Sequence, residues 1–125
     1  MTSKKEIAKD PAREERIDDE IVVDAYDEEE RYTGWYTYLQ ETITFPFKAQ
    51  VIKKSGKSPL HENEIVTVLD MGEFNDYESA MYVQVTWGDR TFSVPLEQLY
   101  PIDADERTIE AVEDWHYWVA RGYSG

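Results

Sequence analysis

The densest group of side chains that could do chemistry is an acidic run that includes Glu20, Asp24, Asp27 and Glu28. Asp24 lies four residues after Glu20, and three and four residues before the other two, so a helix would place them on one face. Like charges at that spacing oppose helix formation unless a cation neutralises them. Ca²⁺ suits this role because it takes six to eight oxygen ligands. The run is therefore a candidate calcium site, which backbone carbonyls, waters or another segment would complete.

Two other interpretations of this acidic run remain open. The first is a solvated acidic helix face that binds nothing. The second is the start of a helix, where carboxylates are stabilised by the positive end of the helix dipole.

A second acidic group, Asp103 to Glu106, precedes the last apolar pattern of the chain. Asp103 and Glu106 have the spacing of a capping box, so we expect Asp103 mainly to cap the last helix. Asp103 and Asp105 remain candidates for a second, weaker ion site. Later acids of this helix are expected to form a solvated face together with Asp105. These acids are Glu110, Glu113 and Asp114.

Neither acidic group is an EF-hand, which needs Gly at loop position 6 and acidic or amide residues at positions 1, 3 and 5. A loop that starts at Asp103 has Arg107 and Thr108 at positions 5 and 6.

Signs of catalysis are also missing from the sequence. His61 is expected on the surface and His116 in packing, in separate elements, and no nucleophile elbow or phosphate-binding loop is present. We therefore expect no enzymatic activity.

The charge of the chain limits its partners. Its 125 residues include 27 Asp and Glu against 13 Lys and Arg, a formal net charge of −14. Such a surface repels nucleic-acid phosphates and anionic lipid and attracts cations. We therefore expect a calcium ion as partner and neither nucleic acid nor membrane; whether there is a protein partner stays open. The absence of a signal peptide and of a long apolar run predicts a cytoplasmic protein.

Acidity is concentrated toward the two ends. Residues 1–43 hold 13 acids and 6 bases, residues 44–102 hold 8 and 5, and residues 103–125 hold 6 and 2. The chain has no Cys, which excludes disulfides and thiolate metal sites.

The apolar pattern predicts an α+β fold in one domain. We expect a mobile polar tail over residues 1–13, then a single calcium-binding domain over 14–125. Its N-terminal helical segment is predicted from Glu14 to about Ile43, with a possible break at Gly34, and Phe45-Pro46-Phe47 should end it.

Short strands are predicted next, followed by a closing helix. They cover residues 47–53, 64–71, 81–87 and 90–94, with a tight hairpin at Gly88-Asp89. A 3₁₀ turn near residues 94–99 should lead to a last short strand, which together predicts a small SH3-like β-barrel. The closing helix, residues 103–121, should pack on the barrel through Ile109, Val112, Trp115 and Val119.

Several sequence strings, in order from about Arg16 to Val119, resemble the CcbP family of cyanobacterial calcium-binding proteins. They are residues 16–30 (RIDDEIVVDAYDEEE), 34–39 (GWYTYL), 45–47 (FPF), 94–96 (VPL), 101–105 (PIDAD) and 113–118 (EDWHYW). The resemblance implies calcium binding without an EF-hand and a role in limiting free intracellular calcium. In filamentous relatives it implies a link to heterocyst differentiation.

Two alternative functions compete with calcium binding. One is an SH3-like protein–protein interaction module whose groove is lined by aromatics such as Trp87, Tyr82 and Tyr100. The other is an acidic DNA mimic, which would use the same net charge.

Overall fold

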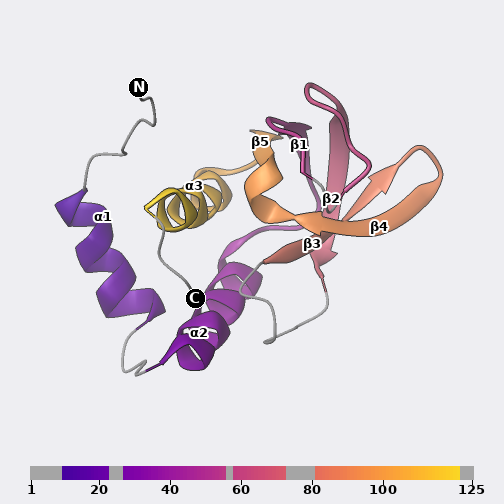
Figure 1. Ribbon diagram of the computed structural model, residues 1–125. Helices are drawn as coiled ribbons and strands as arrows, with labels where there is room; N and C mark the ends of the chain where they lie inside the picture. Colours follow the sequence, from indigo (N-terminus) through magenta and orange to yellow (C-terminus); the bar gives the residue numbers. More distant parts are fainter. Residues whose placement is uncertain (1–9, 23–26, 56–57, 73–80, 122–125) are drawn as a thin grey trace, which may run out of the picture.

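The computed structural model describes residues 10–22, 27–55, 58–72 and 81–121. In these ranges the chain forms three α-helices, a π-helical segment, a 3₁₀ turn and one five-stranded antiparallel sheet. The predicted α+β class is therefore confirmed. The helices lie to one side of the sheet, and α3 (Glu106–Ala120) lies between α1 (Pro11–Arg16) and the strands (Figure 1).

The N-terminal helical segment begins at Pro11, three residues before the expected Glu14. Asp10 caps α1 by accepting a hydrogen bond from the Arg13 amide at 3.1 Å, and proline suits the first helical position. The chain continues as a π-helix, η1 (Ile17–Ile21). Ile17 and Ile21 are buried, and they are the apolar anchors of this segment.

Helix α2 (Glu28–Thr42) runs without a break through Gly34. A Cβ at position 34 would lie 2.3 Å from the carbonyl oxygen of Ile21, so glycine is needed there for close packing of α2 against η1. The interruption that we expected at Gly34 lies earlier in the chain, between Ile21 and Glu28. Helix α2 ends before the Phe45-Pro46-Phe47 string, as predicted.

The first four strands agree with the predicted positions to within two residues, and a fifth follows the 3₁₀ turn as predicted. They are β1 (Phe47–Val51), β2 (Ile65–Met71), β3 (Tyr82–Trp87), β4 (Arg90–Pro95) and β5 (Leu99–Asp103). The sheet order is β4-β3-β2-β1-β5. Gly88, at the first central position of the β3–β4 hairpin, has a φ of +65°, which glycine adopts without strain.

The sheet is not closed into the barrel that we expected. The 3₁₀ turn η2 (Leu96–Gln98) directs the chain from β4 across to β1, where β5 pairs antiparallel. Register shifts in β1 and β2 bend the sheet, but no described residue joins β4 to β5. The sheet therefore stays open between β4 and β5 in the described part of the chain.

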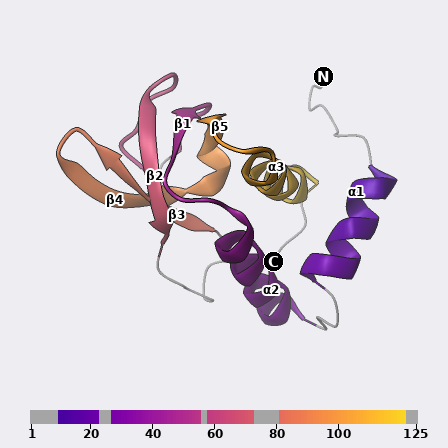
Figure 2. The same ribbon diagram turned by 180° about the vertical axis from the view of Figure 1, so that it is seen from behind.

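Helix α3 packs on the sheet and on α2, as Figure 2 shows from behind. Val112 and Trp115 are buried as predicted, whereas Ile109 and Val119 are only half-buried. The buried face is turned toward Ala111, Asp114, Tyr117 and Trp118. Trp35 of α2 packs edge-on against Trp115, with ring centroids 5.1 Å apart. Among the described residues, no helix is long and apolar enough to cross a membrane.

Candidate metal-binding site

The first acidic group lies on both sides of the connection between η1 and α2. Glu20 is exposed on η1, and Asp27 is the exposed N-cap of α2, where its carboxylate accepts from the Glu30 amide at 2.9 Å. Glu28 is the first residue of α2, and its side chain lies outside the structural description. Asp24 lies outside the described residues. The predicted single helical face is therefore interrupted, because Glu20 and Asp27 belong to different helices.

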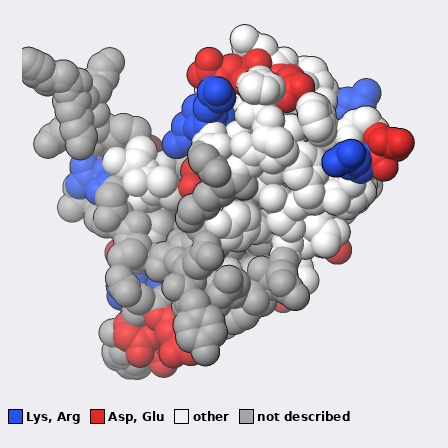
Figure 3. Space-filling view, turned by 45° about the vertical axis from the view of Figure 1, so that its right-hand side comes forward, with Lys and Arg blue, Asp and Glu red and all other residues white. Residues whose placement is uncertain are grey.

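Several carboxylates of this region have no basic partner. Asp18, Asp19, Glu20 and Asp27 are exposed and make no ion pair with any described residue. Figure 3 shows acidic side chains gathered at the end of the molecule where α2 begins. Within the described ranges, however, no three acidic or histidine side chains are close enough together to hold a metal ion.

The second acidic group caps α3, but through a different residue from the one expected. Asp105, and not Asp103, is the N-cap, and its Oδ1 accepts from the Thr108 amide at 2.8 Å. This hydrogen bond lowers the pKa of Asp105. Asp103 is still part of β5, opposite Lys48 of β1, and its side chain is exposed. The capping-box prediction was wrong because β5 includes Asp103, so that α3 begins at Glu106 with Asp105 as its N-cap.

Asp114 contradicts the prediction of a solvated acidic face on α3. Its side chain is 0% exposed, and it is the one fully buried charged side chain among the described residues. Arg13 of α1 donates to its Oδ1 at 2.7 Å, and Arg16 donates to the same oxygen at 2.5 Å. The Tyr38 hydroxyl of α2 donates to Oδ2 at 3.2 Å. Asp114 therefore joins three helices.

The electrostatics of these groups follow from burial. Burial raises the pKa of Asp114, although the two arginines act in the opposite direction. Burial, followed by the charge of Asp114, raises the pKa of Tyr38 to about 12. Burial disfavours the charged form of Arg16, but its bond to Asp114 raises its pKa overall. At neutral pH Tyr38 is therefore a hydrogen-bond donor and Arg16 is a cation.

Further polar contacts extend this contact between α1 and α3. The Tyr117 hydroxyl accepts from the Asp10 amide at 2.9 Å and donates to Glu14 at 2.7 Å. Arg13 also lies 3.8 Å from Glu113, and Arg16 lies 3.7 Å from Glu110. We call Asp114 and its partners Arg13, Arg16 and Tyr38 the clasp. Sequence reasoning missed the clasp because Arg13 was assigned to a mobile tail; the usable signal was the position of Asp114 between buried Ala111 and Trp118 on the helix.

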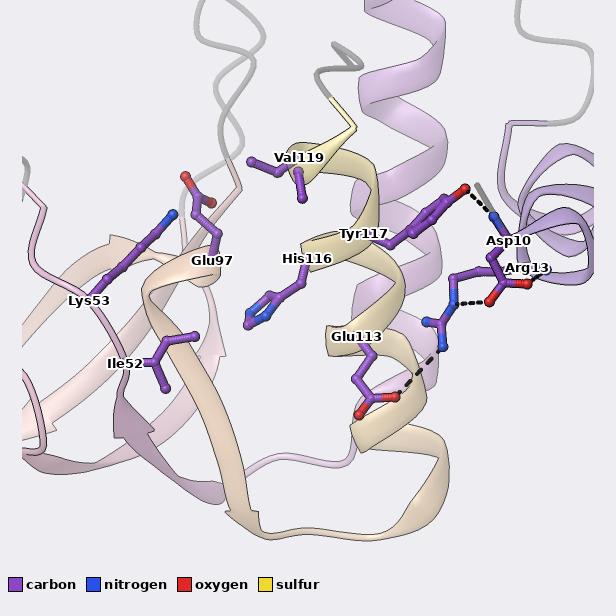
Figure 4. Close-up of a pocket in the computed structure, with 10 residues that line it drawn as sticks. Asp10, Arg13, Ile52, Lys53, Glu97, Glu113, His116, Tyr117 and Val119 are labelled. Atoms are coloured by element: carbon purple, nitrogen blue, oxygen red, sulfur yellow. Dashed lines mark hydrogen bonds and ion pairs between the residues drawn. The ribbon is translucent and has the colours of Figure 1, made fainter. Parts of the chain in front are cut away.

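A groove of about 620 Å³ opens beside the clasp, between α1, α3, η2 and the chain after β1 (Figure 4). Its carboxylates are already engaged by protein donors: Asp10 by Arg13, Glu97 by Trp115 Nε1 at 3.2 Å, and Glu113 by the Tyr100 hydroxyl at 2.5 Å. Lys53 adds a positive charge to the lining. Each of these described carboxylates therefore already accepts a hydrogen bond from the protein, and they do not form a metal-holding group.

His116 lines the same groove, and burial lowers its pKa, so the imidazole is neutral at neutral pH. It is half-buried, consistent with the predicted packing role, and His61 is exposed as expected.

The three aromatics that were expected to line the groove of an SH3-like interaction module, Trp87, Tyr82 and Tyr100, do not lie together. Tyr82 and Trp87 lie at opposite ends of β3, and the Trp87 indole N–H donates to Glu64. Tyr100 lies on β5, where its hydroxyl contacts Glu113 of α3.

Comparisons with known proteins identify the family. The CcbP family model, described as calcium binding, matches residues 15–119. The crystal structure of CcbP from Anabaena is 44% identical, with a TM-score of 0.83 over 95% of this chain and 98% of that chain. A calcium-binding protein in its calcium-binding form is also 44% identical, with a TM-score of 0.79 over 94% and 96% of the two chains. No curated protein sequence matches significantly. This chain belongs to the CcbP family of calcium-binding proteins.

Proposed function

We propose that this chain binds Ca²⁺ through the acidic residues that flank the η1–α2 connection, and that it buffers or senses free calcium in this way. The observation that supports this location is that the exposed carboxylates of Asp18, Asp19, Glu20 and Asp27 have no basic partner in the described part of the chain. Asp114 of the clasp, in contrast, is neutralised by arginine. Other exposed acids, such as Glu62 and Asp70, also form no ion pair with a described residue, but these four lie on either side of one connection.

The donor chemistry of this region fits a hard cation. Carboxylate oxygens are the ligands that Ca²⁺ prefers, and exposed side chains on either side of a connection can adjust to its flexible coordination. Glu20 and Asp27 are the described candidates, and Asp24 and Glu28 are proposed as ligands on sequence grounds. We expect an affinity in the range of sensor sites, roughly 10⁻⁷ to 10⁻⁵ M, with Mg²⁺ weaker because it requires stricter octahedral geometry.

The group around Asp103 and Asp105 is proposed as a secondary, weaker site. Asp105 uses one carboxylate oxygen as a helix cap, as Asp27 does, so this contact does not separate the two groups. Asp103 is exposed but lies opposite Lys48 in the sheet, and that positive charge opposes a cation.

Two double variants with matched structural roles test which site is tighter. Asp24→Asn with Asp27→Asn removes two charges, one of them from the N-cap of α2. Asp103→Asn with Asp105→Asn also removes two charges, one of them from the N-cap of α3. Asparagine is as good a cap as aspartate, so helix stability changes little in either variant. The measurement is calorimetric calcium titration, with magnesium as competitor.

We expect the first variant to weaken the tight site at least about tenfold and the second to change it by less than about threefold. Equal losses would mean that calcium follows overall charge, and a loss only in the second variant would place the site at α3. No heat of calcium binding to the unmodified protein would contradict the proposed function itself.

Buffering and sensing differ in what calcium does to the fold. A sensor changes conformation on binding, whereas a buffer changes little. Hydrogen exchange of the amides in η1 and α2, measured with and without calcium, separates the two roles. Sensing predicts protection changes that extend to the clasp, and buffering predicts changes confined to the η1–α2 connection.

A further inference from the structure

The outer edge of β4 is an open sheet edge. Strand β4 lies at one end of the sheet, where it pairs only with β3. Thr91 and Ser93 are exposed, and no described residue hydrogen-bonds to their backbone from the outer side. An exposed edge presents unpaired amides and carbonyls and is a template for another strand. The opposite edge, β5, is blunted by Pro101 and by an irregularity in its pairing with β1.

The register identifies which backbone groups point outward. In an antiparallel pair, the backbone N–H and C=O of one residue point toward the paired strand and bond to it. Those of the next residue point away from that strand. The two-residue hairpin makes Trp87 and Arg90 a hydrogen-bonded pair, so Thr91 and Ser93 turn their amides outward. Pro95, which has no amide hydrogen, occupies the next outward position. That is where a proline is tolerated on an edge strand.

This edge is also almost free of charge, in contrast to a protein of net charge −14. Figure 3 shows a broad surface without charged side chains, bordered by charged side chains along its upper margin and at its right-hand side. The tip carries Asp89 and Arg90, whose charges cancel. Depletion of charge is characteristic of the centre of protein interfaces.

We propose that the open edge of β4 is a self-association surface, on which β4 of a second copy pairs antiparallel to form a continuous sheet. A two-fold axis at Phe92 pairs Thr91 of each copy with Ser93 of the other. Both residues point their backbone groups outward, so this register makes four interchain hydrogen bonds. Thr–Ser pairs across strands are themselves favourable. An axis between two residues would lose these bonds, and an axis at Thr91 or Ser93 would pair one of them with Asp89 in the turn or with Pro95, which has no amide hydrogen. The axis at Phe92 is therefore the register with most hydrogen bonds.

Side chains on the other face of the strand support the same register. Phe92 of one copy lies directly opposite Phe92 of the other, and aromatic cross-strand pairs stabilise sheets. Trp87 lies 6.1 Å from Phe92, measured between ring centroids, so each copy adds a second aromatic ring beside the axis. The notch formed by Pro59, Trp87 and Phe92 then lies next to the interface in each copy.

The dimer is expected to be weak and to depend on salt. An edge contact of this length falls below about 1,200 Å², the size typical of transient complexes. Two copies of net charge −14 repel each other at long range, and salt screens this repulsion within about 8 Å at physiological strength. Association should therefore strengthen as salt is added.

Sedimentation of the full-length protein from about 10 to about 500 μM, at low and high salt, tests the proposal. We expect the average mass to rise with concentration, and more so at high salt. Ser93→Pro removes an outward amide and should weaken association at least about tenfold, without affecting the β3 ladder. Ser93→Ala is the matched control, since it keeps the amide. Circular dichroism checks that both variants are folded.

A charge swap tests the register without relying on proline. Thr91→Lys with Ser93→Lys places two lysines opposite each other in both pairs and should abolish the dimer, although it lowers the net negative charge. Thr91→Lys with Ser93→Glu places opposite charges in both pairs and should restore it. Thr86→Lys, one strand inward on the same face, should have little effect.

Three results would overturn the proposal. The first is a monomer at every concentration and salt level. The second is a dimer that Ser93→Pro and the two-lysine variant leave unchanged, since another surface would then carry it. The third is an equal response of both charge-swap variants, which would contradict the register.

Discussion

Carboxylates occur both in the clasp and among the exposed acidic residues of η1 and α2, which we call the open group, but the surroundings of the two groups are opposite. Asp114 is buried among two guanidinium groups and a hydroxyl, at distances of 2.5 to 3.2 Å. Asp18, Asp19, Glu20 and Asp27 are exposed and have no basic partner among the described residues. The clasp has its cations built into the chain, whereas the charge of the exposed residues is not compensated by any described basic side chain. The density of carboxylates in the sequence therefore does not by itself show which of them are neutralised within the chain.

Removal of the internal cations should have the largest effect. Arg13→Gln with Arg16→Gln leaves a buried, uncompensated carboxylate at Asp114, which costs about 3 to 5 kcal/mol in the free energy of unfolding. Urea denaturation measures this loss. Arg107→Gln, an exposed position on α3, is the control and should change stability by less than about 0.5 kcal/mol.

A third substitution shows whether the loss comes from charge. Adding Asp114→Asn to the arginine double variant removes the buried charge and should recover a large part of the stability. If the triple variant is as unstable as the double, packing of the arginine side chains rather than electrostatics holds α1 on α3.

Calcium should stabilise the protein through the open group alone. An ion that binds only the folded state at a hundredfold excess over its dissociation constant adds about 2.7 kcal/mol. We expect thermal unfolding to show this gain for the unmodified chain and for the arginine double variant, and to lose most of it in Asp24→Asn with Asp27→Asn. A calcium effect that disappears with the clasp arginines would show that the two regions are coupled.

Tyr38→Phe should have an intermediate effect. It removes one hydrogen bond to a buried charged group, a loss of about 1.5 to 3 kcal/mol at neutral pH. The pKa of Tyr38 is raised to about 12 in the folded state, so its contribution is present below pH 10, declines as the unfolded chain ionises, and is lost as pH rises through about 12. Stability curves of the two proteins should therefore converge toward that pH, and a constant gap would contradict the assigned pKa.

Salt should produce the smallest effect and should act on the open group. Screening weakens repulsion between exposed like charges but affects a buried pair much less. We expect the calcium-free protein to gain about 0.5 to 1 kcal/mol from low to physiological salt. Asp18→Asn with Asp19→Asn should reduce that gain, and Tyr38→Phe, which alters only the clasp, should leave it unchanged.

Most of the fold could be predicted from the sequence because its signals are local. The β3–β4 hairpin was predicted from Gly88-Asp89, and the end of α2 from Pro46. Two errors arose where a long-range contact decides the outcome. Gly34 was interpreted as a helix break, but it is required by the carbonyl of Ile21 in another element. Barrel closure was expected from strand lengths and turns, and these do not determine whether β4 reaches β5.

The candidate site was less predictable than the fold. Acidic spacing indicated Glu20, Asp27 and Asp105 but could not show that two of them are helix caps. Nor could it show that Asp114 is neutralised, since its partners are about a hundred residues away. Asp24 and the Glu28 side chain lie outside the described residues, and their assignment as ligands stays a prediction.

The sequence separation within the clasp has a consequence for synthesis of the protein in the cell. Arg13 and Arg16 are translated 101 and 98 residues before Asp114. During elongation α1 therefore emerges from the ribosome without its partner, while the strands that follow can already pair with one another. The clasp can close only after α3 has left the exit tunnel. Attachment of the N-terminal helix therefore has to wait for the synthesis of α3, and nascent chains shortened before residue 114 should retain a protease-sensitive N-terminal segment.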